Sequence, residues 1–108
     1  GVKGVVEVFE EFRAGLKDVD GFSHIILIYE FHRSQGFKLK VVPFMDTKLR
    51  GIFATRAPKR PNPIGLSTVG LHRIENGNLH VRNVDILDGT PLLGIKPYVP
   101  EFDSPNFI

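Results

Sequence analysis

The proline-rich segment 51–65 constrains the fold of this chain most strongly, because Pro58, Pro61 and Pro63 fall close together in it. A proline fixes its own φ, lacks a backbone donor and pushes the preceding residue toward extended geometry, so a regular helix is excluded here. A segment that is stiff before binding loses little entropy on binding, which favours a preformed site for an anionic or planar polar ligand. The alternative is a surface loop with solvated charges.

The composition describes one compact domain, with 108 residues, 42% of them hydrophobic and 24% charged. The absence of cysteine excludes disulfides, thiolate nucleophiles and cysteine zinc sites. The four histidines are scattered and form no metal-binding motif, so we expect no metal. We also expect no membrane segment and no signal peptide, which fits a cytoplasmic protein. A net charge of +2 decides nothing about partners.

The pattern of apolar residues predicts mostly strands. A helical stripe formed by Phe9, Phe12, Leu16 and Val19 predicts one short helix at 10–17. The continuous apolar run 24–31 is typical of a central strand buried on both faces. Asn76-Gly77 predicts a tight hairpin turn, and the remaining strands are expected at 5–9, 37–42, 64–74, 79–82, 84–87 and 92–98. We therefore predict a mainly β, single-domain, closed or nearly closed β-barrel with one short helix.

Four motifs in the chain resemble the TsaA-like (TrmO-type) family. They are Phe-Ala-Thr-Arg-Ala-Pro-Lys-Arg-Pro-Asn-Pro-Ile-Gly-Leu-Ser at 53–67, Val-Asp-Ile-Leu-Asp-Gly-Thr-Pro at 84–91, Gly-Ile-Lys-Pro-Tyr-Val-Pro at 94–100, and Gly-Phe-Ser-His at 21–24 with Phe-His at 31–32. The resemblance covers essentially the whole chain, residues 1–108, as one TsaA-like β-barrel domain. It implies an S-adenosyl-L-methionine-dependent methyltransferase that acts on N6 of threonylcarbamoyl-adenosine beside the tRNA anticodon, as a homodimer with the cofactor at the dimer interface.

Family members usually begin with a further strand of Ile-Gly-x-Ile type and a Pro-Arg-Gln-like segment that contacts the cofactor. This sequence starts at Gly1-Val2-Lys3-Gly4, after both. We therefore expect the domain to lack that strand.

The cofactor contacts that we expect combine this resemblance with residue chemistry. A guanidinium at Arg56, set among prolines, suits a carboxylate. Asp85, Asp88 and His32 are candidates for accepting a proton or positioning the acceptor, and the sequence does not choose among them. Asp85 and Asp88 could instead form an Asx-turn. The full set of expected cofactor-binding residues is His32, Arg33, Arg56, Leu66, Asn83, Val84, Asp85 and Ile86.

Contacts to tRNA are expected from Lys59 and Arg60 to phosphate, from Asn62 and from Tyr98 stacked on a base. The alternatives are solvated charges at Lys59 and Arg60, a turn cap at Asn62 and a plug of the barrel end at Tyr98. Two other functions stay open for the chain: a non-catalytic RNA-binding β-barrel, or a cofactor-binding methyltransferase with a different substrate.

Overall fold

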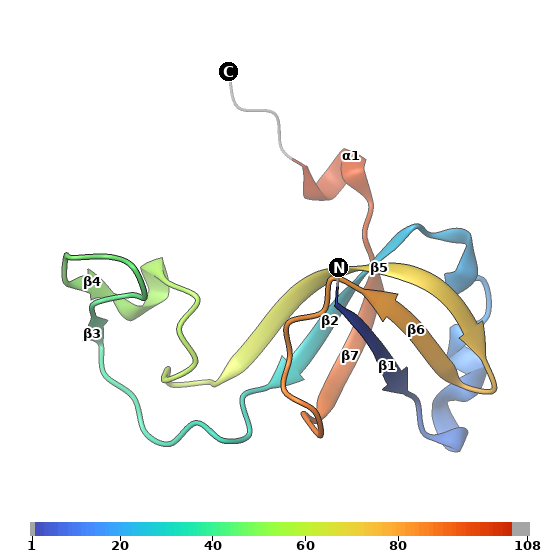
Figure 1. Cartoon of the computed structure of the whole chain (residues 1–108), viewed down its shortest axis with the longest axis horizontal. Helices are drawn as coiled ribbons and strands as arrows, with labels where there is room; N and C mark the ends of the chain where they lie inside the picture. The colour runs from blue at the N-terminus through green and yellow to red at the C-terminus, as the bar shows by residue number, and fades with distance from the viewer. Residues whose placement is uncertain (1, 105–108) are drawn as a thin grey trace.

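A five-stranded antiparallel sheet organises the chain, in the strand order β1-β6-β5-β2-β7 (Figure 1). The structure, a computed structural model, describes residues 2–104, so position 1 and positions 105–108 of the predicted domain lie outside the described residues. The sheet strands are β1 (Lys3–Glu7), β2 (His24–Glu30), β5 (Ile64–Glu75), β6 (Asn78–Arg82) and β7 (Leu92–Pro97). The other elements are a separate pair β3 (Lys40–Val41) and β4 (Arg50–Gly51), the 3-10 helices η1 (Glu10–Leu16), η2 (Val19–Gly21) and η3 (Ile52–Ala54), and the helix α1 (Pro100–Asp103).

The core lies against one face of the sheet because alternate residues of a strand point to the same side. In β2, Ile25, Leu27 and Tyr29 are buried, whereas Ile26 and Ile28 are half-buried. β2 pairs with β5 on one side and β7 on the other, so its central position is confirmed, but its burial on both faces is only partial. The buried cluster comprises Val8, Ile25, Leu27, Tyr29, Val69, Leu79 and Val81.

The predicted hairpin is confirmed. β5 and β6 pair from Glu75↔Asn78, and the two residues between them, Asn76 and Gly77, have φ values of 50° and 78°. Two successive positive φ angles form the type I′ turn whose twist matches the flanking strands.

The predicted closure into a barrel is not confirmed. Among the described residues, β1 pairs only with β6 and β7 only with β2, which leaves both as edges of an open sheet. The sheet is nevertheless strongly curved (Figure 1). Register shifts at Ile28/Tyr29 and at Leu71/Arg73 are bulges of the kind that bend a strand.

Two predicted strands were wrong in whole or in part. Residues 84–87 are irregular, because Asn83 turns the chain with a φ of 60° and no strand pairs with them. The predicted strand 37–42 shrinks to β3, whose pairing with β4 covers two residues and ends before Pro43. A proline cannot donate to a strand ladder, so Pro43 limits the strand at its C-terminal end. The alternation at 37–39 did not lead to pairing.

The predicted helix at 10–17 is present as the 3-10 helix η1. Leu16 and Val19 pack against the core, but Phe9 and Phe12 are 68% and 64% exposed. Only two of the four residues of the predicted apolar stripe therefore pack against the core. None of the helices in residues 2–104 combines the length and apolarity needed to cross a membrane.

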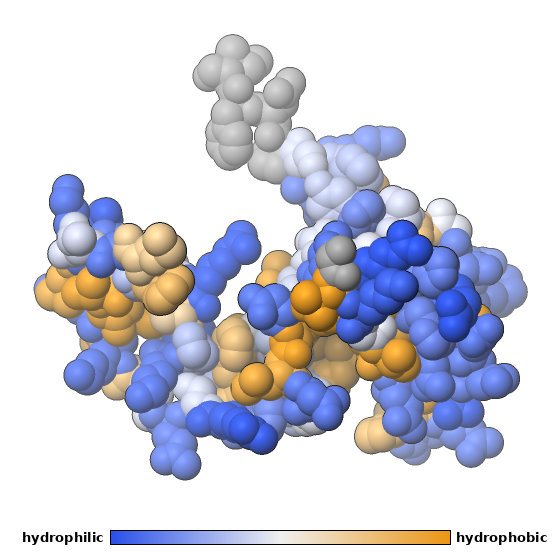
Figure 2. Space-filling view, in the orientation of Figure 1, coloured by the Kyte–Doolittle hydropathy of each residue, from blue (hydrophilic) through white to orange (hydrophobic). Residues whose placement is uncertain are grey.

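An arm, defined here as residues 37–53, extends from the sheet and contains β3, β4 and the first two residues of η3 (Figure 1). Ile52 is its one buried side chain, and the Ile52 N–H donates to the Leu39 carbonyl at 2.8 Å. Figure 2 shows apolar side chains at the arm's surface and a hollow between the arm and the sheet. Its exposed apolar residues are Phe37, Leu39, Val42, Phe44, Met45, Leu49 and Phe53.

Candidate functional site

A cavity of about 370 Å³ opens where β2 ends, beside the proline-rich loop and the loop before β7. This volume lies within the range of small-ligand sites. Its lining residues are Tyr29, Glu30, Phe31, His32, Arg33, Ser34, Pro58, Lys59, Asp85, Ile86, Leu87 and Thr90.

Three hydrogen bonds hold the end of β2 between the two loops. The Phe31 N–H donates to the Pro63 carbonyl at 2.7 Å, and the Glu30 N–H donates to the Pro91 carbonyl at 3.1 Å. The Ser34 hydroxyl donates to the Pro58 carbonyl at 3.1 Å. Segments distant in sequence therefore meet at this cavity through backbone contacts.

Internal polar contacts stabilise the proline-rich loop. The Thr55 hydroxyl donates to the Ile52 carbonyl at 2.8 Å and accepts from the Ala57 N–H at 3.2 Å. Nη1 of the half-buried Arg60 donates to the Thr55 and Ala57 carbonyls at 2.9 and 3.2 Å. We expected Arg60 to contact phosphate, but its Nη1 donates hydrogen bonds within the loop itself.

Gly65 allows the Tyr29 ring to lie directly on the backbone of β5. A Cβ at position 65 would clash with the Tyr29 ring. The Tyr29 hydroxyl is hydrogen-bonded to the Ser67 hydroxyl at 2.8 Å, and the ring meets Phe31 edge-on at 5.6 Å between centroids. Gly65 is therefore a position of close approach, and it fixes an aromatic wall of the cavity.

The loop between β6 and β7 supplies the opposite wall. The Asn83 N–H donates to the Val2 carbonyl at 2.7 Å, which anchors the loop to the N-terminal segment. Its turn is closed by Thr90, whose N–H and hydroxyl donate to the Leu87 carbonyl at 3.2 and 2.6 Å. Within the described chain no Asx-turn forms here, because neither aspartate side chain closes the turn.

Five of the predicted site residues come together at this cavity: His32, Arg33, Lys59, Asp85 and Ile86. Four of them are exposed and Ile86 is half-buried against the core. They belong to three different segments, so the structure unites residues that the sequence analysis connected only through resemblance.

The remaining predicted residues do not line the cavity: Arg56, Leu66, Asn83, Val84 and Asp88 among the cofactor and catalytic candidates, and Arg60, Asn62 and Tyr98 among the RNA candidates. Val84 is half-buried against the core, while Leu66 is 61% exposed. Tyr98 lies at the opposite end of β2, where its N–H donates to the His24 carbonyl at 3.1 Å.

Sequence reasoning missed several lining residues, notably Glu30, Phe31, Ser34 and Thr90. One feature of the sequence could have pointed to Glu30 as a site residue: it is a carboxylate close to His32 and Arg33 at the end of a strand. The cavity lining therefore includes two carboxylates, Glu30 and Asp85, besides its basic side chains. Within residues 2–104 no group of three or more metal-ligating side chains gathers.

Residues 1–104 match the family described as the tRNA-methyltransferase O N-terminal domain. Over 102 residues the chain is 62% identical to a Pyrococcus abyssi protein named "Probable S-adenosyl-L-methionine-binding protein", covering 94% of this chain and 55% of that relative. It is 39% identical to the mouse (Mus musculus) tRNA (adenine(37)-N6)-methyltransferase, over 92% of this chain and 24% of that protein. A solved structure, "Crystal structure of TrmO", superposes with a TM-score of 0.80 at 42% identity and covers 95% of this chain and 46% of that one.

The chain therefore spans about half the length of the Pyrococcus relative and of the solved structure, and less of the mouse enzyme. The family match nevertheless extends over nearly every residue of this sequence. The chain belongs to the family of tRNA-methyltransferase O N-terminal domains.

Proposed function

We propose that this domain binds S-adenosyl-L-methionine and methylates N6 of threonylcarbamoyl-adenosine beside the tRNA anticodon. The observation that carries the proposal is the cavity in which the end of β2, the proline-rich loop and the loop before β7 meet. Relatives named as S-adenosyl-L-methionine-binding proteins and as a tRNA methyltransferase support the same chemistry.

The residues at the cavity fit such a cofactor. Arg33 and Lys59 provide positive charge for a carboxylate, and Arg33 offers a planar fork that Lys59 lacks. Glu30 and Asp85 provide acceptors for ammonium or ribose hydroxyl groups. The aromatic ring of Phe31 and the aliphatic side chains of Ile86 and Leu87 also line the cavity and suit contact with a purine ring.

The bound cofactor would supply an electrophilic methyl group on a sulfonium, which needs no metal and no covalent enzyme intermediate. The protein's task is then positioning, to which its hydrogen-bonded loops are suited. The acceptor nitrogen carries a carbamoyl group and is a poor nucleophile, so a nearby proton acceptor aids the reaction. Asp85 and His32 line the cavity and remain candidates, whereas Asp88 lies outside the lining.

Homodimer formation is part of the proposal. The arm exposes Phe44 and Met45 at 95% and 89%, together with Phe53 at 75%. Contiguous exposed apolar surface of this kind marks interaction sites. A second copy that covers the arm would bury these side chains beside the proline-rich loop.

We further propose that the 1–108 domain becomes a closed barrel when another strand, such as the Ile-Gly-x-Ile strand implied by the resemblance, adds to an edge of the sheet. The edges of β1 and β7 have backbone groups free for such pairing in the described chain. A tRNA substrate would place the activity in the cytoplasm.

Calorimetry with S-adenosyl-L-methionine tests the cofactor site. Arg33 and Arg56 are the two candidates for binding the cofactor carboxylate. Arg33 lines the cavity, whereas Arg56, which the sequence favoured, does not, so we expect only the loss of Arg33 to weaken cofactor binding. We expect Arg33→Gln to weaken binding by roughly 1.5 to 3 kcal/mol, the usual worth of a hydrogen bond to a charged group. Equal loss in Arg56→Gln would restore the sequence-based assignment, and no heat from the parent protein would refute the cofactor site.

Transfer of a labelled methyl group tests the substrate. We expect methylation of tRNA that carries threonylcarbamoyl-adenosine and none of tRNA lacking it. Asp85→Asn should lower kcat and shift the pH profile if Asp85 accepts the proton, and should raise the cofactor Kd if it binds ribose. Methylation of both tRNAs would favour a different substrate, while RNA binding without cofactor binding would favour the non-catalytic RNA-binding barrel.

A further inference from the structure

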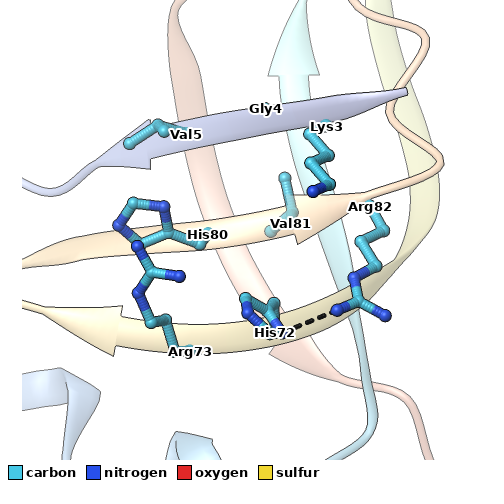
Figure 3. Close-up of a pocket in the computed structure, with 8 residues that line it drawn as sticks. All are labelled: Lys3, Gly4, Val5, His72, Arg73, His80, Val81 and Arg82. Carbon is cyan, nitrogen blue, oxygen red and sulfur yellow. Dashed lines mark hydrogen bonds between the residues drawn. The ribbon is translucent and has the colours of Figure 1, made fainter. Parts of the chain in front are cut away.

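A second cavity, of about 300 Å³, lies on the face of β1, β6 and β5 and carries an unusual density of positive charge (Figure 3). It shares no lining residue with the candidate methyl-transfer site. We call it the basic cleft, and its lining is Lys3, Gly4, Val5, His72, Arg73, His80, Val81 and Arg82.

Strand register brings the charged and imidazole side chains of the cleft onto one face. Lys3 pairs with Arg82 across β1 and β6. The β5–β6 register then shifts between Leu71 and Arg73, which leaves His72 as the extra residue of a β-bulge and sets Arg73 opposite His80. A bulge re-aims side chains, and here the successive residues His72 and Arg73 are both exposed at the cleft. Without the bulge, strict alternation would send one of them to the opposite face.

The electrostatics of the cleft are strongly positive. Nη2 of Arg82 lies 2.8 Å from Nδ1 of His72, and the Arg82 charge lowers the pKa of His72, with burial and then Arg73, Lys3 and His80 adding to the effect. Glu75 is the carboxylate that reaches the cluster, 3.3 Å from Nε of Arg73 and 3.7 Å from Nε2 of His80. The cleft lining itself contains no carboxylate.

We propose that the basic cleft binds backbone phosphate of the RNA substrate and anchors it away from the methyl-transfer cavity. Lys3, Arg73 and Arg82 supply permanent charge, and the imidazoles of His72 and His80 add N–H donors. Such a set recognises phosphate oxygens through charge-assisted hydrogen bonds. The inference rests on the proposed RNA partner but not on the cofactor.

The geometry favours an extended polyanion over a small one. β5 runs from Ile64, which pairs with the last residue of β2 beside the candidate cavity, to His72 at the basic cleft. Eight residues of strand cover about 26 Å, and curvature shortens this span. A folded RNA can reach both sites at once, whereas a free phosphate ion would occupy only one.

Fluorescence anisotropy with a fluorescein-labelled tRNA transcript, without cofactor, tests the proposal. The variant Lys3→Gln/Arg82→Gln is compared with Lys17→Gln/Lys96→Gln, which removes the same charge from exposed positions outside both cavities and outside the arm. We expect the cleft variant to raise Kd at least tenfold more than the control. Its log Kd should also depend less on log salt, by roughly 1.4 to 1.8 in slope for two lost phosphate contacts. Equal effects in both variants would overturn the proposal.

Two further measurements separate the possible outcomes. In the first, inorganic phosphate is titrated into the protein while NMR follows the imidazole resonances of His72 and His80. If these resonances shift but the cleft variant binds tRNA as tightly as the parent, the cleft is a free-phosphate site and RNA anchoring is refuted. Calorimetry with S-adenosyl-L-methionine should give the parent affinity in the cleft variant, so failure of the cofactor proposal is distinguishable from failure of this one. Thermal unfolding checks the fold, and Lys3→Gln alone replaces the double variant if that variant unfolds.

Discussion

The sheet and the segment 31–63, which leaves it after β2 and returns at β5, use apolar residues in opposite ways. In the sheet, Ile25, Val69 and Leu79 are completely buried. Throughout 31–63, every residue of which the structure describes, Ile52 is the one buried side chain, while Phe44 is 95% exposed. Segment 31–63 contains eight lysine and arginine residues and four prolines, against four basic residues and one proline in the five strands, so its composition already differs from that of the sheet.

Of the two regions, only the sheet contains a cluster of buried apolar side chains. Apolar surface that stays in water contributes nothing to folding, so the exposed aromatic residues of the arm add little to the stability of the fold. The same segment supplies His32, Arg33, Pro58 and Lys59 to the candidate site. Segment 31–63 thus supplies six of the twelve residues that line this cavity, although it contributes a single buried side chain.

The largest expected effect contrasts one side chain from each region. Leu27→Ala should lower the free energy of unfolding by about 2 to 5 kcal/mol, because it leaves a cavity beside residues with no exposed surface. Phe44→Ala should change it by less than about 0.5 kcal/mol. Urea unfolding at low protein concentration measures both, and a comparable loss in the two variants would mean that the arm belongs to the folding core.

A smaller loss is expected where the two regions meet. Gly65→Ala places a Cβ against the Tyr29 ring and should cost roughly 1 to 3 kcal/mol of stability, the scale of overpacking. Gly51→Ala is the matched control, since a Cβ there meets no neighbour within 4 Å. A double-mutant cycle with Tyr29→Leu should recover part of the loss. An unchanged unfolding midpoint in Gly65→Ala would contradict the close contact.

Self-association gives the third test, in which the arm should matter and the sheet should not. Phe44→Ala should raise the homodimer dissociation constant about tenfold, equivalent to about 1.4 kcal/mol for one interface aromatic. Sedimentation velocity over a concentration series measures it. Phe102→Ala serves as control, because Phe102 is 80% exposed but belongs to α1, outside the arm. A monomeric parent protein at all concentrations would remove the proposed dimer.

The smallest effect concerns the turn that shapes the arm. The pKa of Asp46 lies below its ordinary value of 3.8, because its carboxylate accepts from the Lys48 N–H, the Arg50 side chain and the Thr47 N–H. A lowered folded-state pKa means that this stabilisation is present above pH 3.8 and is lost as the pH falls through the folded value. We expect the NMR shift of the Thr47 amide to titrate below 3.8 in the parent and not in Asp46→Asn, with Asp20→Asn as control. A midpoint at or above 3.8 would exclude these contacts.

The sequence predicted the sheet well where turn chemistry and alternation agree. Asn76-Gly77 located the β5–β6 hairpin, and the apolar run at 24–31 located β2. The prediction of a strand at 84–87 was wrong. Its apolar and polar residues alternate, but the chain turns at Asn83, which has a positive φ, and residues 84–87 pair with no strand of the described chain. Closure of a barrel likewise depends on edge pairing, which local patterns do not encode.

The candidate site was partly predictable, for a similar reason. The motif at 84–91 and the Phe-His pair at 31–32 pointed to Asp85 and His32, which share the cavity. Glu30 and Ser34 were missed, because their place at the cavity depends on hydrogen bonds from the Glu30 N–H to the Pro91 carbonyl and from the Ser34 hydroxyl to the Pro58 carbonyl. The basic cleft was also missed, since His72 and Arg73 share a face only through a bulge, which shows in the register and not in the composition.

The antiparallel pairing of β2 with β5, with all of 31–63 looped out between them, also bears on how such a chain can change. Closing a flexible loop costs entropy that grows only logarithmically with its length, about 0.6 kcal/mol for each doubling. Insertions and replacements in this loop are therefore inexpensive for the fold, although long-range pairing slows folding. Descendants of this sequence can remodel the arm and the rim of the cavity while Ile25, Leu27 and Val69 stay in register.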